Sequence, residues 1–117
     1  MYDTLIHLER IGDVDVATIG NDIDVGTAPV VERYLGEAAA YGAAFVVSLE
    51  ECRFVDSTGL SVLLRIARRV GERFAIVVPP KAPSRRVFDL TGLGTQMNMC
   101  DTLSQALDRV GKKAMSA

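Results

Sequence analysis

Three consecutive side chains that accept hydrogen bonds stand where a helix is expected to begin: Asp56, Ser57 and Thr58. Such side chains can satisfy the backbone N–H groups that have no partner in the first turn of a helix. The helix is indicated by apolar residues at the i, i+3, i+4, i+7 spacing of one face, namely Leu60, Leu63, Leu64 and Ala67. The simplest interpretation of the three residues is an N-cap.

A second interpretation gives the Ser57 hydroxyl a chemical role. A phosphoryl group on Ser57 would face unpaired backbone N–H groups and the positive end of the helix dipole. It would add about −1.5 to −2 charges beside the carboxylate of Asp56. A helix end can hold such a charge, whereas a partner surface that had accepted a neutral hydroxyl would repel it. The sequence permits such a switch and leaves the simple cap open.

The elements around this helix start are predicted to bring further acidic residues to it. Residues 14–19 and 45–49 are apolar, β-branched runs typical of strands, with a helical segment between them. A strand–helix–strand unit makes the two strands parallel, so the loops that leave their carboxyl ends share one edge. Asp22 and Asp24 are therefore expected to flank Ser57. The alternative is that these two aspartates make Asx-turns and cap the next helix.

The helix between these strands is predicted from its boundary residues and its apolar face. Thr27 is the expected N-cap, and Pro29 falls in the first turn, where its missing N–H costs little. The helix should continue to about Tyr41, and Gly42 should end it. Its buried face is expected to contain Ala28, Val31, Leu35 and Ala38.

The remaining segments complete an α/β fold. Residues 5–10 should pair with residues 14–19 as an antiparallel hairpin across a short turn at 11–13. Residues 74–78 form a fourth apolar run, and residues 94–100 are weakly strand-like, with Met97 and Met99 on one side of a short edge strand. The expected sheet is thus mixed, with an antiparallel hairpin followed by parallel strands.

About four helices are expected in all. A short helix over residues 83–90 should end in a left-handed turn at Gly92. Asp101 and Thr102 should cap a last helix, whose buried face contains Leu103, Ala106, Leu107 and Val110. Residues 1–117 make a single domain, and residues 112–117 are expected to be a flexible tail.

Three segments, in order and at the right distances, resemble the anti-sigma factor antagonists, which are small proteins with the STAS fold. The first is residues 54–60, Phe-Val-Asp-Ser-Thr-Gly-Leu, followed by an amphipathic helix. The second is the acidic loop of residues 20–28. The third is residues 86–93, which resemble the third helix of the family and its exit turn. The resemblance covers nearly the whole chain.

This resemblance implies a function. In that family the first hydroxyl after the aspartate is the phosphoacceptor, which here is Ser57. The unphosphorylated protein binds an anti-sigma factor that is also a serine kinase with a histidine-kinase-like ATPase fold, and the sigma factor is released. The kinase uses ATP to phosphorylate the serine and the complex dissociates, and a metal-dependent serine/threonine phosphatase restores the hydroxyl. The expected partner-binding residues are Asp22, Asp24, Asp56, Ser57, Thr58 and Gly59.

Composition argues against several other classes of protein. The chain has 13 Lys and Arg against 15 Asp and Glu, a formal net charge of −2, and no basic stripe for nucleic acid or polybasic run for a membrane surface. It lacks a secretory signal and any apolar run near the ~20 residues of a membrane span. We therefore expect a cytoplasmic protein. Cys52 and Cys100 should be free thiols, and with His7 as the single histidine we expect neither a metal site nor a cofactor.

Three rival interpretations remain. An enzyme is disfavoured because His7 is the only histidine and nucleophile-elbow, P-loop and dinucleotide motifs are absent. A phospho-aspartate receiver would make Asp56 the phosphoacceptor, but Lys81 comes too early for the receiver lysine. A stand-alone STAS scaffold or transport-system subunit would keep the fold without the switch.

Val62 and Ile66 either widen the buried face of their helix or join an exposed docking patch.

Overall fold

A computed structural model describes residues 6–40 and 44–111. In this described part of the chain, five strands form one sheet in the order β1-β2-β3-β4-β5. β1 pairs antiparallel with β2, and every later pair is parallel. The strands are β1 Ile6–Ile11, β2 Val14–Ile19, β3 Ala44–Ser48, β4 Phe74–Val77 and β5 Met99–Cys100. The mixed sheet that the sequence predicts is therefore confirmed.

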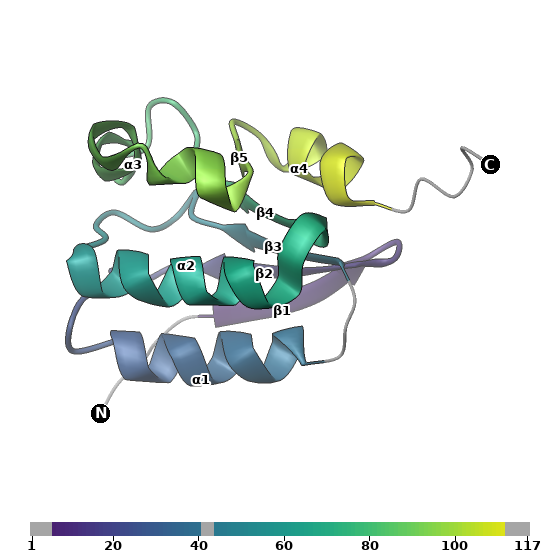
Figure 1. Ribbon diagram of the computed structural model, residues 1–117, viewed down its shortest axis with the longest axis horizontal. Helices are drawn as coiled ribbons and strands as arrows, with labels where there is room; N and C mark the ends of the chain where they lie inside the picture. The colour runs from purple at the N-terminus through teal and green to yellow at the C-terminus, as the bar shows by residue number, and fades with distance from the viewer. Residues whose placement is uncertain (1–5, 41–43, 112–117) are drawn as a thin grey trace.

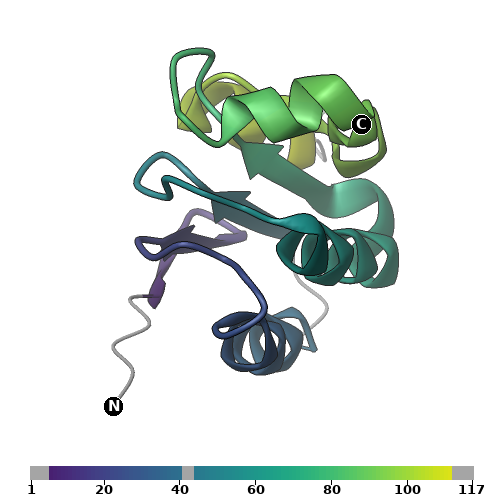
Figure 2. The ribbon, with the colours of Figure 1, turned by 90° about the vertical axis from the view of Figure 1, so that its left-hand side faces the viewer.

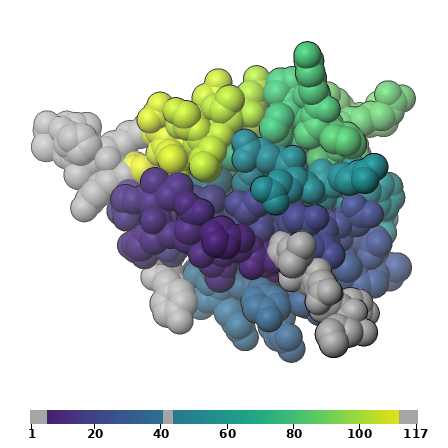
Figure 3. All heavy atoms as spheres, turned by 180° about the vertical axis from the view of Figure 1, so that it is seen from behind, coloured from purple at the N-terminus to yellow at the C-terminus, as the bar shows by residue number. Residues whose placement is uncertain are grey.

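Within residues 6–40 and 44–111, four α-helices and two short 3-10 helices connect and cover this sheet (Figure 1). The α-helices are α1 Ala28–Ala39, α2 Ser57–Val70, α3 Arg85–Thr91 and α4 Leu103–Val110, and the 3-10 helices are η1 Gly71–Arg73 and η2 Leu93–Met97. α1 and α2 lie side by side, and α3 lies beyond α2 on the side away from α1 (Figures 1 and 2). The edge strand β1 lies on the face shown in Figure 3, in purple. In the described ranges 6–40 and 44–111, no helix has the length and apolar character that a membrane span needs.

Side-chain alternation along the central strands divides the core into two layers. Phe45 and Val47 of β3 pack with α1 and α2, whereas Ala44 and Val46 face the other layer, with Ala106 of α4. All five residues of β3 and all four of β4 are buried. The continuous apolar runs arise because both faces of these strands are covered.

Several predicted boundaries shift. α1 ends at Ala39, with Ala40 as C-cap, short of the predicted Tyr41. Three predicted positions lie outside the described residues. They are the end of the first helix at Tyr41 and Gly42, the start of the first strand at Leu5, and the tail 112–117. The short helix begins at Arg85 rather than residue 83, and Gly92 has the predicted left-handed conformation, with φ 72°.

The predicted strand over residues 94–100 is wrong for most of its length. Residues Leu93–Met97 form η2, and only Met99–Cys100 pair with β4. The segment lies between two residues with positive φ, Gly92 and Asn98 (φ 53°). Left-handed residues at both ends turn the chain too sharply for an extended strand to enter and leave. Met97 is buried in the core as a result.

The structure also decides between the two alternatives for Val62 and Ile66 of α2. Val62 and Ile66 are both buried in the layer beneath α1 and α2. They widen the buried face of the helix, so the alternative of an exposed docking patch containing them is wrong. The outer surface of α2 carries arginines, and Arg65 forms two hydrogen bonds of 2.8 and 2.9 Å with Glu32 of α1. Those bonds lower the pKa of Glu32.

Both cysteines are buried free thiols, as the sequence predicts. Burial raises the pKa of Cys52 to about 11 and also raises the pKa of Cys100. Because the thiolate is the reactive form, we expect iodoacetamide at pH 8 to modify the native protein at least about tenfold more slowly than the protein in guanidinium chloride. Mass spectrometry over time measures both rates. Equal rates in the two conditions would contradict the buried positions.

Candidate functional site

The loops that follow β2 and β3 are joined by a short parallel bridge between Ile23 and Val55. The Ile23 N–H donates to the Phe54 carbonyl at 2.9 Å, and the Asp56 N–H donates to the Ile23 carbonyl at 3.0 Å. The two loops therefore meet at one edge of the sheet, as the parallel topology predicts. Ile23 and Val55 are buried, so this bridge anchors the start of α2 to the loop before α1.

Asp56 caps α2 and also holds the neighbouring loop. Its Oδ1 atom accepts a hydrogen bond from the Gly59 N–H at 2.9 Å, and its Oδ2 atom accepts one from the Val25 N–H at 3.2 Å. Each carboxylate oxygen is thus bonded to a backbone amide. Of the three residues expected to cap the helix, Asp56 performs that role, and the side chains of Ser57 and Thr58 are not needed for it.

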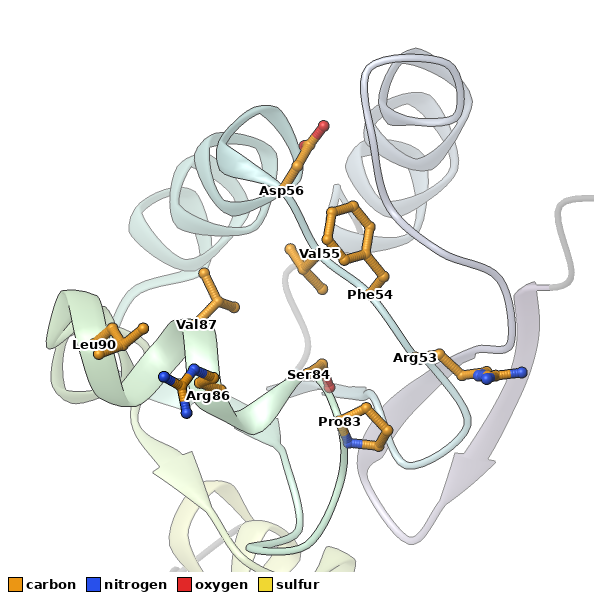
Figure 4. Close-up of a pocket in the computed structure, with 9 residues that line it drawn as sticks. All are labelled: Arg53, Phe54, Val55, Asp56, Pro83, Ser84, Arg86, Val87 and Leu90. Atoms are coloured by element: carbon orange, nitrogen blue, oxygen red, sulfur yellow. The ribbon is translucent and has the colours of Figure 1, made fainter.

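Ser57 is the first residue of α2, and both it and Thr58 are exposed. The Ser57 side chain therefore lies at the positive end of a 14-residue helix, open to solvent. Figure 4 shows Asp56 at the point where the loop enters α2. Ser57 therefore lies between the capping residue and the first turn of the helix.

The two acidic residues after β2 differ in what they do. Asp24 Oδ1 accepts hydrogen bonds from the N–H groups of Gly26 and Thr27 at 2.9 and 3.1 Å. This is the turn-forming role that stood as the alternative for Asp24. Asp22 is exposed, and within the described ranges its carboxylate has no hydrogen-bond or ion-pair partner. Asp22 is thus the acidic residue of this loop that remains available to a partner.

Thr27 occupies the predicted N-cap position of α1 without the predicted contact. Its side chain makes no capping bond to the helix. Instead the Thr27 hydroxyl accepts from the Asp24 N–H at 3.0 Å and donates to the Asp22 carbonyl at 2.8 Å. The hydroxyl therefore closes the loop upon itself, and Asp24 supplies an acceptor for the backbone N–H of Thr27.

Gly59 is buried and lies against the other loop. A Cβ atom at this position would be 2.5 Å from the carbonyl oxygen of Ile23 and 2.8 Å from its Cγ2 atom. Real Cβ atoms do not approach other heavy atoms so closely. The glycine thus permits the bridge between the loops, and it belongs to the site as a support rather than as a contact surface.

Two exposed apolar residues lie close to Asp56 at the start of α2, and the sequence analysis did not identify them. Val25 is 72% exposed and Phe54 is 52% exposed. Val25 is tied to Asp56 through its backbone N–H, and Phe54 lies two residues before Asp56. The sequence could have indicated that Phe54 is exposed, because adjacent residues of an extended chain point to opposite sides and Val55 is buried.

In the described parts of the chain, no group of three or more His, Cys, Asp or Glu residues is placed to hold a metal ion.

Replacing Asp56 with Ala is expected to lower the free energy of unfolding by about 1–2 kcal/mol, because the variant loses the N-cap bond to Gly59. Asp56→Asn is the matched control, since asparagine is an equally good cap, and we expect it to cost less. Urea denaturation followed by circular dichroism measures both. Equal losses for the two variants would contradict the capping role.

The sequence is similar to a known domain family and to proteins that belong to it. A family model described as "STAS domain" matches residues 6–106. The anti-sigma-F factor antagonist RsfB of Mycobacterium tuberculosis is 33% identical over 99 residues, which are 83% of this chain and 81% of RsfB. The anti-sigma-B factor antagonist of Bacillus subtilis is 34% identical over 83 residues, covering 69% of this chain and 75% of that protein.

The solved structures include a relative that is similar in fold and in sequence. The crystal structure of an anti-sigma factor antagonist from Mycobacterium paratuberculosis superposes with a TM-score of 0.85 and 29% identity, covering 94% of this chain and 96% of that one. The range matched by the family model, residues 6–106, includes the two joined loops and the start of α2. The chain belongs to the STAS domain family.

Proposed function

We propose that this protein is an anti-sigma factor antagonist whose binding is switched by phosphorylation of Ser57. The names of its relatives support the first part of the proposal, since RsfB and the Bacillus subtilis protein are both anti-sigma factor antagonists. The exposed hydroxyl of Ser57 at the capped start of α2 supports the second. The unphosphorylated form binds an anti-sigma factor, and the sigma factor held by that partner is released.

The accessibility of Ser57 is the observation that carries this proposal. A kinase must bring the γ-phosphate of ATP into line with the attacking hydroxyl, and Ser57 is open to solvent on an ordered helix start. The resulting phosphoryl group adds negative charge where the partner had met a neutral hydroxyl. Like charges that face each other across an interface cost several kcal/mol, so phosphorylation ends the complex.

The partners follow from this cycle. The anti-sigma factor is itself a serine kinase with a histidine-kinase-like ATP-binding fold, and a metal-dependent serine/threonine phosphatase returns the protein to its binding form. We assign direct contact with the kinase to the exposed residues Asp22, Ser57 and Thr58. Asp24, Asp56 and Gly59 shape that surface from beneath, because their polar or steric contacts lie within the protein. The protein works in the cytoplasm and is not an enzyme.

The receiver-like alternative conflicts with the surroundings of Asp56. A phospho-aspartate receiver needs an aspartate oxygen free to attack phosphorus, but each oxygen of Asp56 accepts a hydrogen bond from a backbone amide. A scaffold or transport role without a switch remains a second candidate function, and the same exposed surface would serve it. The two candidates differ in whether Ser57 ever receives phosphate.

Incubation with candidate kinases and ATP, followed by mass spectrometry, tests the proposal directly. We expect a single phosphate, located on Ser57 and stable to hydroxylamine, as phosphoserine is. Phosphate on Thr58 would show that the neighbouring hydroxyl is the acceptor. A hydroxylamine-sensitive group on Asp56 would support the receiver interpretation, and no phosphate with any kinase would favour the scaffold.

A further inference from the structure

A groove of about 370 Å³ lies beside the start of α2, between the chain that leads to Asp56 and helix α3 (Figure 4). One wall contains Phe54 and Val55, and the other contains Val87 and Leu90 of α3. Figure 4 shows the side chains of Val55 and Val87 pointing toward one another across it. Asp56 is the groove residue nearest in sequence to Ser57, and its carboxylate points away from the groove.

Most of the residues that line this groove are apolar, and two of the large ones are exposed. Leu90 is 72% exposed and Phe54 is 52% exposed. Three of the described large apolar side chains that are exposed, Val25, Phe54 and Leu90, lie along this one edge of the molecule. Exposed apolar surface gathered in one place is a mark of a binding site.

Two arginines and one buried serine are among the polar residues that line the groove. Arg53 begins one wall and Arg86 lies on α3, and both are exposed. Neither arginine has an ion-pair partner within residues 6–40 and 44–111. At the base, Ser84 is 2% exposed and its hydroxyl has no hydrogen-bond partner in the same ranges. An acceptor on a bound segment, such as a backbone carbonyl, would remove the cost of that unpaired hydroxyl.

We propose that this groove receives a segment of the anti-sigma factor that carries a large apolar side chain next to a carboxylate. The inference rests on the proposed function and names the chemistry by which the same partner is held. The apolar side chain lies between Phe54 and Leu90, and the carboxylate meets Arg86. This anchor lies beside Ser57 rather than on it, so the kinase can hold the protein while its ATP site reaches the hydroxyl.

Two other occupants fit the groove less well. Small-molecule sites are concave and bury most of the surface of their ligand, whereas the side chains of Phe54 and Leu90 on the two walls here are 52% and 72% exposed. A second copy of this chain would form a symmetric contact in which each subunit presents the same patch. That contact would bring Arg86 and Arg53 of both copies together, and the repulsion would oppose it.

The test uses the kinase that phosphorylates Ser57 in the mapping experiment and measures its affinity for the full chain by calorimetry. Leu90→Ser is expected to weaken binding by about 10- to 30-fold, as removal of a central apolar contact does. Leu90 is mostly exposed, so the variant should fold normally. Leu8→Ser is the matched control, because Leu8 is an exposed leucine on the distant strand β1, and we expect less than a twofold change.

The charge of the groove and the kinetics give a second readout. Arg86→Glu should weaken binding more than Arg86→Gln, with the difference shrinking at high salt. Arg33→Glu on α1 is the charge control and should have little effect. In phosphorylation assays Leu90→Ser should raise KM while kcat at saturation stays within about twofold of the wild type, because a docking contact does not touch the reacting atoms.

Each outcome decides between the two proposals. If the kinase phosphorylates the wild type and Leu90→Ser binds as tightly as the wild type, the groove inference fails and the switch stands. Concentration-dependent dimers that Leu90→Ser abolishes would make the occupant a second copy and would also overturn the inference. If no kinase labels the wild type at all, the proposed function fails, and the groove inference fails with it.

Discussion

Ser57→Ala is expected to abolish phosphate incorporation while leaving affinity for the kinase within about threefold of the wild type. The substitution removes the attacking oxygen, and no capping bond is lost, because Asp56 caps α2 through Gly59. Ser57 is also exposed, so the fold has no need of its hydroxyl. Labelling with radioactive ATP and calorimetric titration measure the two properties separately.

Ser57→Asp should have the opposite pattern for binding. A carboxylate at the start of α2 adds negative charge and removes the hydroxyl donor, so we expect affinity for the kinase to fall by roughly 10-fold or more. Phosphoserine should weaken binding further because its charge is larger. Helix stability should not suffer, since negative charge is favourable at a helix N-terminus.

Thr58→Ala is the control for both Ser57 variants. Thr58 is the next residue, is exposed and also carries a hydroxyl, so this variant keeps the Ser57 acceptor and should still incorporate one phosphate. Full labelling of Ser57→Ala would show that Thr58 is the acceptor. Unchanged affinity of Ser57→Asp would remove charge repulsion as the physical basis of the switch.

The sequence was informative where one side chain determines local structure. Asp56 predicted the start of α2, and Thr102 accepts from the Gln105 N–H at 3.1 Å as a predicted cap of α4. The apolar runs of β3 and β4 predicted strands buried on both faces, and parallel topology predicted that the acidic loop would meet the start of α2. Each of these follows from short-range patterns or from the order of elements along the chain.

Prediction failed where left-handed turns or contacts between distant residues decide the structure. Residues 94–97 alternate weakly, yet the left-handed turns at both ends make them a 3-10 helix. The alternatives for Asp24 and for Val62 needed the packed structure, because capping and burial depend on what lies opposite. The groove joins Phe54 with Leu90, which are far apart in the chain, and neither residue alone indicates a shared surface.

Ile23 shows how the site depends on such a distant contact. Its backbone N–H and carbonyl bond to Phe54 and Asp56 on either side of Val55, and its side chain is buried. Through these bonds the loop with Asp22 is held in register with the helix start that carries Ser57. The proposed contact surface is therefore only as well ordered as this short bridge, and Gly59 is the residue that permits it.

Gly59→Ala is accordingly expected to lower the free energy of unfolding by about 3 kcal/mol, at the upper end of the usual cost of adding atoms to a packed site. The new Cβ would lie 2.5 Å from the Ile23 carbonyl oxygen, which is backbone and cannot rotate away as a flexible side chain would. The two loops must separate, which strains the hydrogen bonds at both ends of the bridge. Urea denaturation measures the loss.

Gly26→Ala is the matched control for this prediction. Gly26 lies in the loop that Gly59 contacts, but its Cβ would meet only Asp24 Oδ1, at an ordinary 3.4 Å. We expect that variant to stay within about 1 kcal/mol of the wild type. Because alanine is a better helix former than glycine by about 1 kcal/mol, a stabilised Gly59→Ala protein would show that the loops do not touch closely. Affinity for the kinase is measured on the same samples, below the unfolding transition. If Gly59→Ala is destabilised but binds the kinase normally, the contact surface does not depend on the bridge between Ile23 and Val55.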